Sequence, residues 1–136
     1  MGEKSFQLEI VTPRKTVFSS TVESFSAPGI VGGFQVLKNH APLLSSIGIG
    51  EVKIMDSQGK EWRYSTSGGF VEVRDNKVVM LAETAERANE IDTKRAEGAR
   101  GRAQKRITEK KIETDVERAR IALQRAINRL KVAQHV

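Results

Sequence analysis

Arginine is concentrated in the segment AERANEIDTKRAEGARGRAQKRI, residues 85–107, where large apolar residues are scarce. A guanidinium group binds phosphate oxygens through paired N–H donors, and a carboxylate accepts hydrogen bonds from ribose or adenine. On a helix that turns about 100° per residue, Asp92, Arg95 and Arg102 fall within roughly 80° of one another. These three residues on one face could therefore bind a small phosphate-bearing anion.

A second cationic pair, Arg125 and Arg129, lies one helical turn apart further along the chain. A helical hairpin that joined both groups would place three or four guanidinium groups near one carboxylate. The alternative is a solvated helix surface with pairs such as Asp92–Arg95, each worth roughly a few tenths of a kcal/mol. Spacing alone favours the solvated surface.

A basic tail of this kind could also bind nucleic acid. Two observations argue against that function: the arginines alternate with acidic residues, and the chain has only one Trp and one Tyr to stack against bases. The interleaved acids are Glu97, Glu109, Asp115 and Glu117.

Catalytic chemistry is sparse in the rest of the sequence. The chain has no cysteine, which excludes disulfides, thiolate metal sites and cysteine nucleophiles. His40 in LKNHAPLL (37–44) has no nearby Ser, Asp or Cys partner and is expected to be structural. The phosphate-loop, dinucleotide and zinc-protease motifs are missing from the sequence. We therefore expect a non-catalytic protein with no metal site and no required cofactor.

Residues up to about 86 have the signals of β-structure. Phe6, Leu8 and Ile10 alternate with polar residues, which is the period of a half-buried strand. DSQGK (56–60) indicates one hairpin, and Asp75-Asn76 indicates the turn of another. Many short strands without a helical period predict a small antiparallel β-sandwich or flattened barrel.

The remaining residues predict two helices, from about Asn89 to Ile107 and from about Glu113 to Ala133, with Asn89 as N-cap. The segment 106–115 is polar enough to form a turn between them, but it contains no Gly or Pro and could instead remain helical. The second helix has a heptad seam with alanine at every second apolar position. Such a hairpin buries little apolar area, so it should open easily. The seam residues are Val116, Ala119, Leu123, Ala126, Leu130 and Ala133, facing Ile91, Ala96, Ala99 and Ala103.

Charge divides the chain at the same place. Residues 1–85 hold nine Lys and Arg against nine Asp and Glu, whereas residues 86–136 hold fourteen against eight and supply the net charge of +6. We therefore expect a neutral β-domain at 1–86 and a basic helical domain at 87–136. The composition fits a soluble protein, and neither a leader sequence nor a membrane-spanning run is recognisable.

Three segments together resemble the epsilon subunits of bacterial F-type ATP synthases. They are GGFQVLKNHAPLL (32–44), STSGGFVEVRDNKVVMLAETAERANEID (65–92) and RARIALQRAINRLKVA (118–133). Lys38-Asn39 departs from the Pro-Gly of many bacterial members. The resemblance spans the whole chain.

That resemblance implies a non-catalytic rotor subunit of a proton-translocating synthase, peripheral on the cytoplasmic face of the plasma membrane. It implies an α+β fold, with a β-sandwich of about ten strands followed by a two-helix antiparallel hairpin. The sandwich would contact the gamma subunit and the c-ring. The hairpin would either fold down or extend toward the catalytic beta and alpha subunits, where it inhibits ATP hydrolysis.

Some members of this family bind ATP through an Ile/Leu-Asp-x-x-Arg-Ala motif, which IDTKRA (91–96) matches in full. By this resemblance ATP is a regulatory ligand that stabilises the folded hairpin. The alternative is that the motif only braces the helices. The implied ATP-binding residues are Glu86, Ile91, Asp92, Arg95, Arg102, Arg125 and Arg129.

Overall fold

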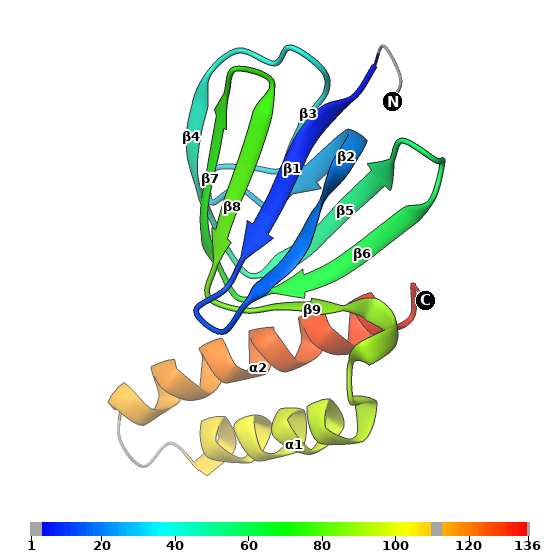
Figure 1. Ribbon diagram of the computed structural model, residues 1–136. Helices are drawn as coiled ribbons and strands as arrows, with labels where there is room; N and C mark the ends of the chain where they lie inside the picture. Colours follow the sequence, from blue (N-terminus) through cyan, green and yellow to red (C-terminus); the bar gives the residue numbers. More distant parts are fainter. Residues whose placement is uncertain (1–3, 110–112, 136) are drawn as a thin grey trace. The chain divides into compact units, whose positions relative to one another are not determined.

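The computed structural model describes residues 4–109 and 113–135 (Figure 1). The chain consists of two compact units, Met1–Arg87 and Ala88–Val136. The first unit contains the β-strands and the second contains the helices. Their boundary lies one residue later than the 86/87 boundary expected from the sequence.

The first unit is a β-sandwich built from one continuous sheet. The hydrogen-bonded order is β4-β7-β8-β1-β2-β5-β6-β9, and β3 pairs with β2. The β1–β8 pair is parallel, whereas the other pairs between named strands are antiparallel. The predicted sandwich is confirmed, with nine strands in the described residues where about ten were expected. The strands are β1 (Phe6–Val11), β2 (Thr16–Ala27), β3 (Phe34–Val36), β4 (Leu43–Ile47), β5 (Gly50–Asp56), β6 (Glu61–Thr66), β7 (Gly69–Arg74), β8 (Lys77–Ala82) and β9 (Ala85–Arg87).

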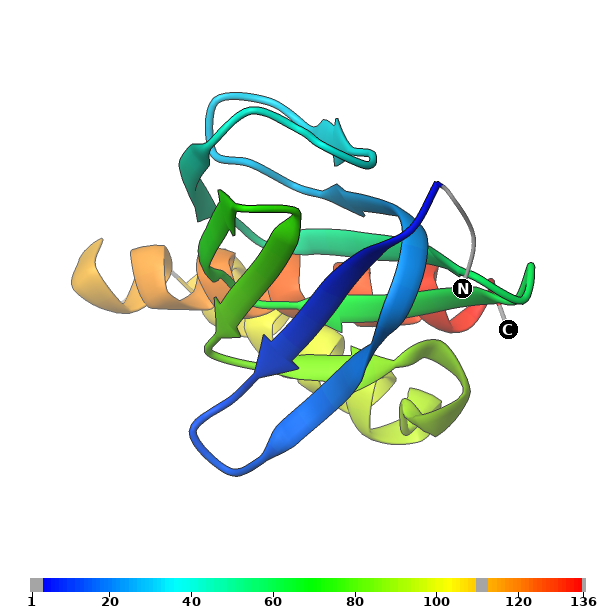
Figure 2. The ribbon, with the colours of Figure 1, turned by 45° about the horizontal axis from the view of Figure 1, so that its top comes forward.

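The core of the sandwich lies between the two halves of the curled sheet (Figure 2). Phe6, Leu8 and Ile10 of β1 are all buried, as the alternation predicted. Phe25 is the largest of the fully buried side chains. Because every strand from β1 to β8 contributes at least one buried residue to a single cluster, the sheet halves cannot separate without exposing the core.

Both predicted hairpin turns are present. Asp75 and Asn76 have φ values of 52° and 59°, as a two-residue turn of the I′ type requires. In the β5–β6 turn the Asp56 carboxylate accepts 2.9 Å hydrogen bonds from the backbone N–H groups of Gln58 and Lys60 and a 3.0 Å bond from Trp62 Nε1. These bonds, led by the one from Trp62, hold the pKa of Asp56 below its ordinary value.

The second unit begins with a short 3-10 helix, η1 (Ala88–Glu90), followed by α1 (Thr93–Glu109) and α2 (Glu113–Ala133). The bounds of α2 agree with the prediction. The prediction that Asn89 caps the first helix is wrong, because Asn89 lies inside η1 and α1 begins four residues later. Of the segment 106–115, residues 106–109 continue the first helix and residues 113–115 belong to α2, while residues 110–112 lie outside the described residues.

The two helices form an antiparallel hairpin whose contact surface is rich in alanine (Figure 1). Ala96 and Ala103 of α1 and Ala119 and Ala126 of α2 are buried, whereas Leu123 is only half-buried. The predicted shallow seam is therefore present. Neither of these helices is both long and apolar enough to span a membrane.

Candidate functional site

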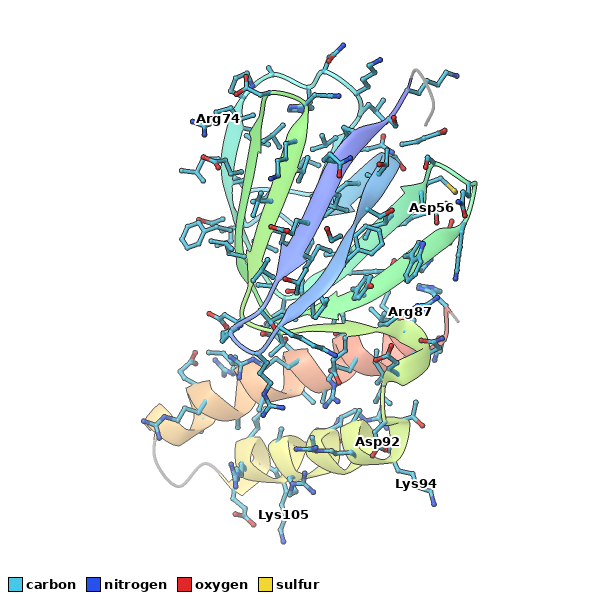
Figure 3. The ribbon with its side chains drawn as sticks, in the orientation of Figure 1. Asp56, Arg74, Arg87, Asp92, Lys94 and Lys105 are labelled. Atoms are coloured by element: carbon cyan, nitrogen blue, oxygen red, sulfur yellow. The ribbon has the colours of Figure 1, made fainter. Side chains whose placement is uncertain are left out.

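Asp92 forms the N-cap of α1. Its Oδ1 accepts a 3.0 Å hydrogen bond from the backbone N–H of Arg95, and its carbonyl oxygen accepts another of 3.0 Å from Ala96. An aspartate cap satisfies one of the unpaired N–H groups of the first turn and places negative charge at the positive end of the helix dipole. Figure 3 shows Asp92 at this end of the helix. The carboxylate is thereby fixed at the entrance of α1.

The segment 91–96 divides its residues between packing and solvent. Ile91 is buried against Val132 and Ala88, and Ala96 is completely buried. Asp92 and Arg95 are exposed. The apolar members of the motif therefore hold the hairpin together, while its charged members face outward.

Arg95 and Arg102 share one exposed face of α1, since seven residues correspond to about two turns. Gly98 lies between them on the same face. The Nη1 of Arg102 lies 3.2 Å from the position that a β-carbon on Gly98 would occupy. The guanidinium of Arg102 thus lies back along the helix toward the turn that carries Arg95.

Arg125 and Arg129 lie on the half of α2 that faces this part of α1. Ile91 and Val132 belong to one apolar cluster, so the start of α1 lies beside the end of α2. Both helices advance about 1.5 Å per residue in opposite directions. Arg129 is therefore roughly level with the first turn of α1, and Arg125 with Gly98.

Glu86 differs from the other predicted ATP-binding residues. It lies on β9 of the first unit, opposite Ser65 of β6, and is half-buried. The remaining six belong to the helical unit. Within the described ranges, no group of three or more histidines and carboxylates is arranged to hold a metal ion.

Pairs of the kind expected for a solvated surface occur at other positions. Arg100 donates to Glu97, and Arg120 donates to Glu117 at 2.7 Å, both with i,i+3 spacing. Asp92 instead accepts from the backbone of Arg95, so this pair is not the side-chain ion pair of the surface interpretation. Lys94 and Lys105 project from α1 on the side away from α2 (Figure 3), which leaves that side basic.

Sequence reasoning missed an exposed apolar patch on β4, β7 and β8. Leu44, Phe70 and Leu81 are 72%, 55% and 56% exposed, and Phe70 pairs directly with Leu81 across the sheet. The signal was present in the sequence. Each residue adjoins another apolar residue in its strand and so breaks the alternation of a half-buried strand. A patch of this kind marks an interaction surface.

The loop between β2 and β3 adds a second apolar feature. Ile30 is 69% exposed and Val31 is fully exposed. Large apolar side chains at the tip of a loop are typical of contact with another protein.

A sandwich with an exposed apolar patch, followed by a hairpin with outward arginines, has the features of a two-unit binding protein without a catalytic centre among its described residues. The ATP synthase delta/epsilon chain β-sandwich domain matches residues 5–88, and the delta/epsilon chain long α-helix domain matches residues 89–134. The chain therefore belongs to the delta/epsilon family of ATP synthase subunits. The chain is accordingly a non-catalytic subunit of the central stalk of F-type ATP synthase.

Individual relatives agree with this assignment. The chain is 45% identical to the ATP synthase epsilon chain of Desulforamulus reducens, over 96% of this chain and 98% of that one. It is 49% identical to the epsilon chain of Nitratidesulfovibrio vulgaris, over 96% of each. A chain in the cryo-EM structure of the Euglena gracilis mitochondrial ATP synthase matches with a TM-score of 0.84 at 22% identity, covering 96% of this chain and 82% of that chain. That last likeness shows the fold.

Proposed function

We propose that the helical hairpin regulates ATP hydrolysis by the synthase and that ATP is the ligand of its folded state. The observation that carries this proposal is that the apolar residues of 91–96 pack inside the hairpin while its charged residues are exposed. Ile91 and Ala96 pack inside the hairpin, while the capped Asp92 and Arg95 remain available to a ligand. Arg125 and Arg129 come from the other helix, so the complete site exists only when the two helices are packed together.

The alanine seam makes the folded hairpin easy to displace. Apolar burial contributes roughly 25 cal/mol per Å², and alanine has little side-chain area to bury. A ligand that binds only the folded hairpin stabilises it according to its concentration relative to its dissociation constant. ATP would therefore shift the population toward the folded hairpin, which does not inhibit hydrolysis.

In the extended state the helices would reach the catalytic beta and alpha subunits and inhibit hydrolysis. The fourteen Lys and Arg against eight Asp and Glu in residues 86–136 support this part of the proposal. A basic helix is steered toward acidic surfaces, and the attraction falls as salt increases.

The apolar patch formed by Leu44, Phe70 and Leu81, together with the Ile30-Val31 loop, would join the sandwich to the gamma subunit and the c-ring. These contacts would place the chain on the cytoplasmic face of the plasma membrane, where the complex couples proton flow to ATP synthesis. The exposure of all five side chains supports docking by this unit.

The cap formed by Asp92 favours a second candidate, in which 91–96 braces the hairpin without binding ATP. Calorimetry of the full chain with ATP and ADP separates the two. We expect ATP to bind more tightly than ADP, and no detectable heat at millimolar ATP would leave only the bracing role. Deletion of the residues after Arg87 should relieve inhibition of hydrolysis in the reconstituted synthase; unchanged hydrolysis would contradict the inhibitory role.

A further inference from the structure

Helix α1 contains two glycines in its interior, Gly98 and Gly101. Each is expected to weaken the helix relative to alanine. Their surroundings differ. A β-carbon on Gly101 would have no heavy atom within 4 Å, whereas a β-carbon on Gly98 would lie 3.2 Å from Nη1 of Arg102. The two glycines therefore lower the stability of the helix by the same amount but differ in the space around them.

The space above Gly98 is where the Arg102 guanidinium lies. A contact of 3.2 Å is tighter than most β-carbon contacts, so an alanine here would require the guanidinium to shift by a few tenths of an ångström. Helical side chains lean toward the N-terminus, which is why Arg102 covers the residue four positions before it. The missing side chain at position 98 lets this arginine lie close to the helix backbone.

The charge around Arg102 points to an anionic ligand. The residues three and four positions away from it are Gly98, Ala99, Lys105 and Arg106, and none of them is acidic. Glu97, the nearest acid in the chain, accepts from Arg100. Arg102 itself is exposed. Like charges at this spacing repel one another, and a bound anion relieves the repulsion.

We propose that Gly98 is a positioning residue for the nucleotide. By leaving room for Arg102, it directs this guanidinium toward the turn that carries Arg95, at the level of Arg125 on the facing helix. The ligand groups that these cations receive are the phosphates of a nucleoside triphosphate. The proposal rests on the proposed function, since it assigns a role within the same site.

Gly101 provides a matched control. Gly98→Ala and Gly101→Ala bring the same gain in helix propensity, so any general effect of a stiffer α1 on binding is common to both. Only in Gly98→Ala does the added β-carbon come within 4 Å of the Arg102 guanidinium. The difference in ligand affinity between the two variants therefore measures the effect of the position of the Arg102 guanidinium.

The test is calorimetry of the full chain with ATP and with inorganic triphosphate, together with thermal unfolding of each variant. We expect Gly98→Ala to weaken binding of both ligands by about tenfold relative to Gly101→Ala, equivalent to roughly 1.4 kcal/mol. Both variants should unfold at or above the wild-type temperature. In an Arg102→Ala background, Gly98→Ala should cause no further loss.

Two negative outcomes are distinguishable. If the wild-type chain binds ATP and the two glycine variants bind it equally well, the positioning role of Gly98 is overturned while the ATP site stands. If the wild-type chain binds no ATP, the proposed function and this inference both fail. A further loss from Gly98→Ala in the Arg102→Ala background would show that Gly98 acts through something other than Arg102.

Discussion

The guanidinium carbon of Arg87 lies 4.1 Å from the centroid of the Trp62 ring. Arg87 is the last residue of β9 and of the first unit, and Trp62 lies on the neighbouring strand β6. Lys60 Nζ also contacts the ring at 4.4 Å, and Phe18 meets it edge-on with centroids 5.3 Å apart. The contact between Arg87 and Trp62 thus fixes β9, the last strand of the sandwich, to β6 just before the chain enters the helical unit.

Substitution of Arg87 should loosen this end of the sandwich. We expect Arg87→Ala to lower the free energy of unfolding by about 0.5–1 kcal/mol, because the cation–π contact is lost. Trp62 is the only tryptophan, so acrylamide quenching of its fluorescence should increase in the variant. Arg74→Ala, on an exposed arginine of β7, is the control. Equal quenching in both variants would contradict a role for the Arg87 contact.

Asp56 should make the stability of the sandwich depend on acidic pH. Its pKa in the folded state is held below the ordinary 3.8, chiefly by the hydrogen bond from Trp62, so the folded state binds its proton less readily than the unfolded state. The stability that it contributes is complete above about pH 5 and is lost as the pH falls below 3.8 toward the lowered folded-state pKa. Urea unfolding from pH 7 to pH 3 should show a smaller loss for Asp56→Asn than for wild type. Parallel curves for the two proteins would rule out this contribution.

The apolar patch should be dispensable for folding and necessary for assembly. Phe70 is 55% exposed, so Phe70→Glu should change the free energy of unfolding by no more than about 0.5 kcal/mol. Co-purification with the gamma subunit should fall by at least about tenfold, because a charge would be buried against an apolar partner. Glu72→Ala, at an exposed position of the same strand, serves as control. If Phe70→Glu still co-purified with the gamma subunit, a surface other than the apolar patch would be the docking surface.

Asp92 caps α1 and is a proposed ligand group for ATP, and two substitutions separate these two roles. Asparagine caps helices about as well as aspartate, so Asp92→Asn should keep the wild-type unfolding temperature while weakening ATP binding. Asp92→Ala should lose the helix cap as well as ATP affinity, and the lost cap should lower the free energy of unfolding by about 1 kcal/mol. Circular dichroism and calorimetry measure the two effects. Lys94→Ala, on the outer side of α1, is the control and should leave the unfolding temperature and the ATP affinity nearly unchanged. If Asp92→Asn bound ATP with wild-type affinity, the role of the carboxylate would be limited to capping the helix.

Local pattern was sufficient for much of the fold. The alternation of Phe6, Leu8 and Ile10 predicted a strand, and Asp75-Asn76 predicted its turn, because both depend on neighbours in sequence. The N-cap prediction failed because Asn89 and Asp92 are both good caps. The choice between them depends on how Ile91 packs against Val132, a contact between residues far apart in the chain.

The candidate site was predictable only in part, because it too depends on contacts that residue spacing does not specify. Residue spacing placed Arg95 and Arg102 on one face, which the helix confirms. Spacing could not show that Arg102 lies over Gly98, since the direction of a long side chain depends on the room beside it. The contact between Arg87 and Trp62 requires the pairing of β6 with β9, which no local pattern specifies.

The place of β1 between β8 and β2 affects how the chain folds. Ile10 pairs with Met80, seventy positions later, so one side of β1 has no hydrogen-bonded neighbour until most of the domain has been synthesised. Pairings between residues so distant in sequence form slowly, and an open strand edge can pair with another chain in the meantime. The sandwich should therefore be most prone to aggregation while it is still emerging from the ribosome, before its first strand can pair with its eighth.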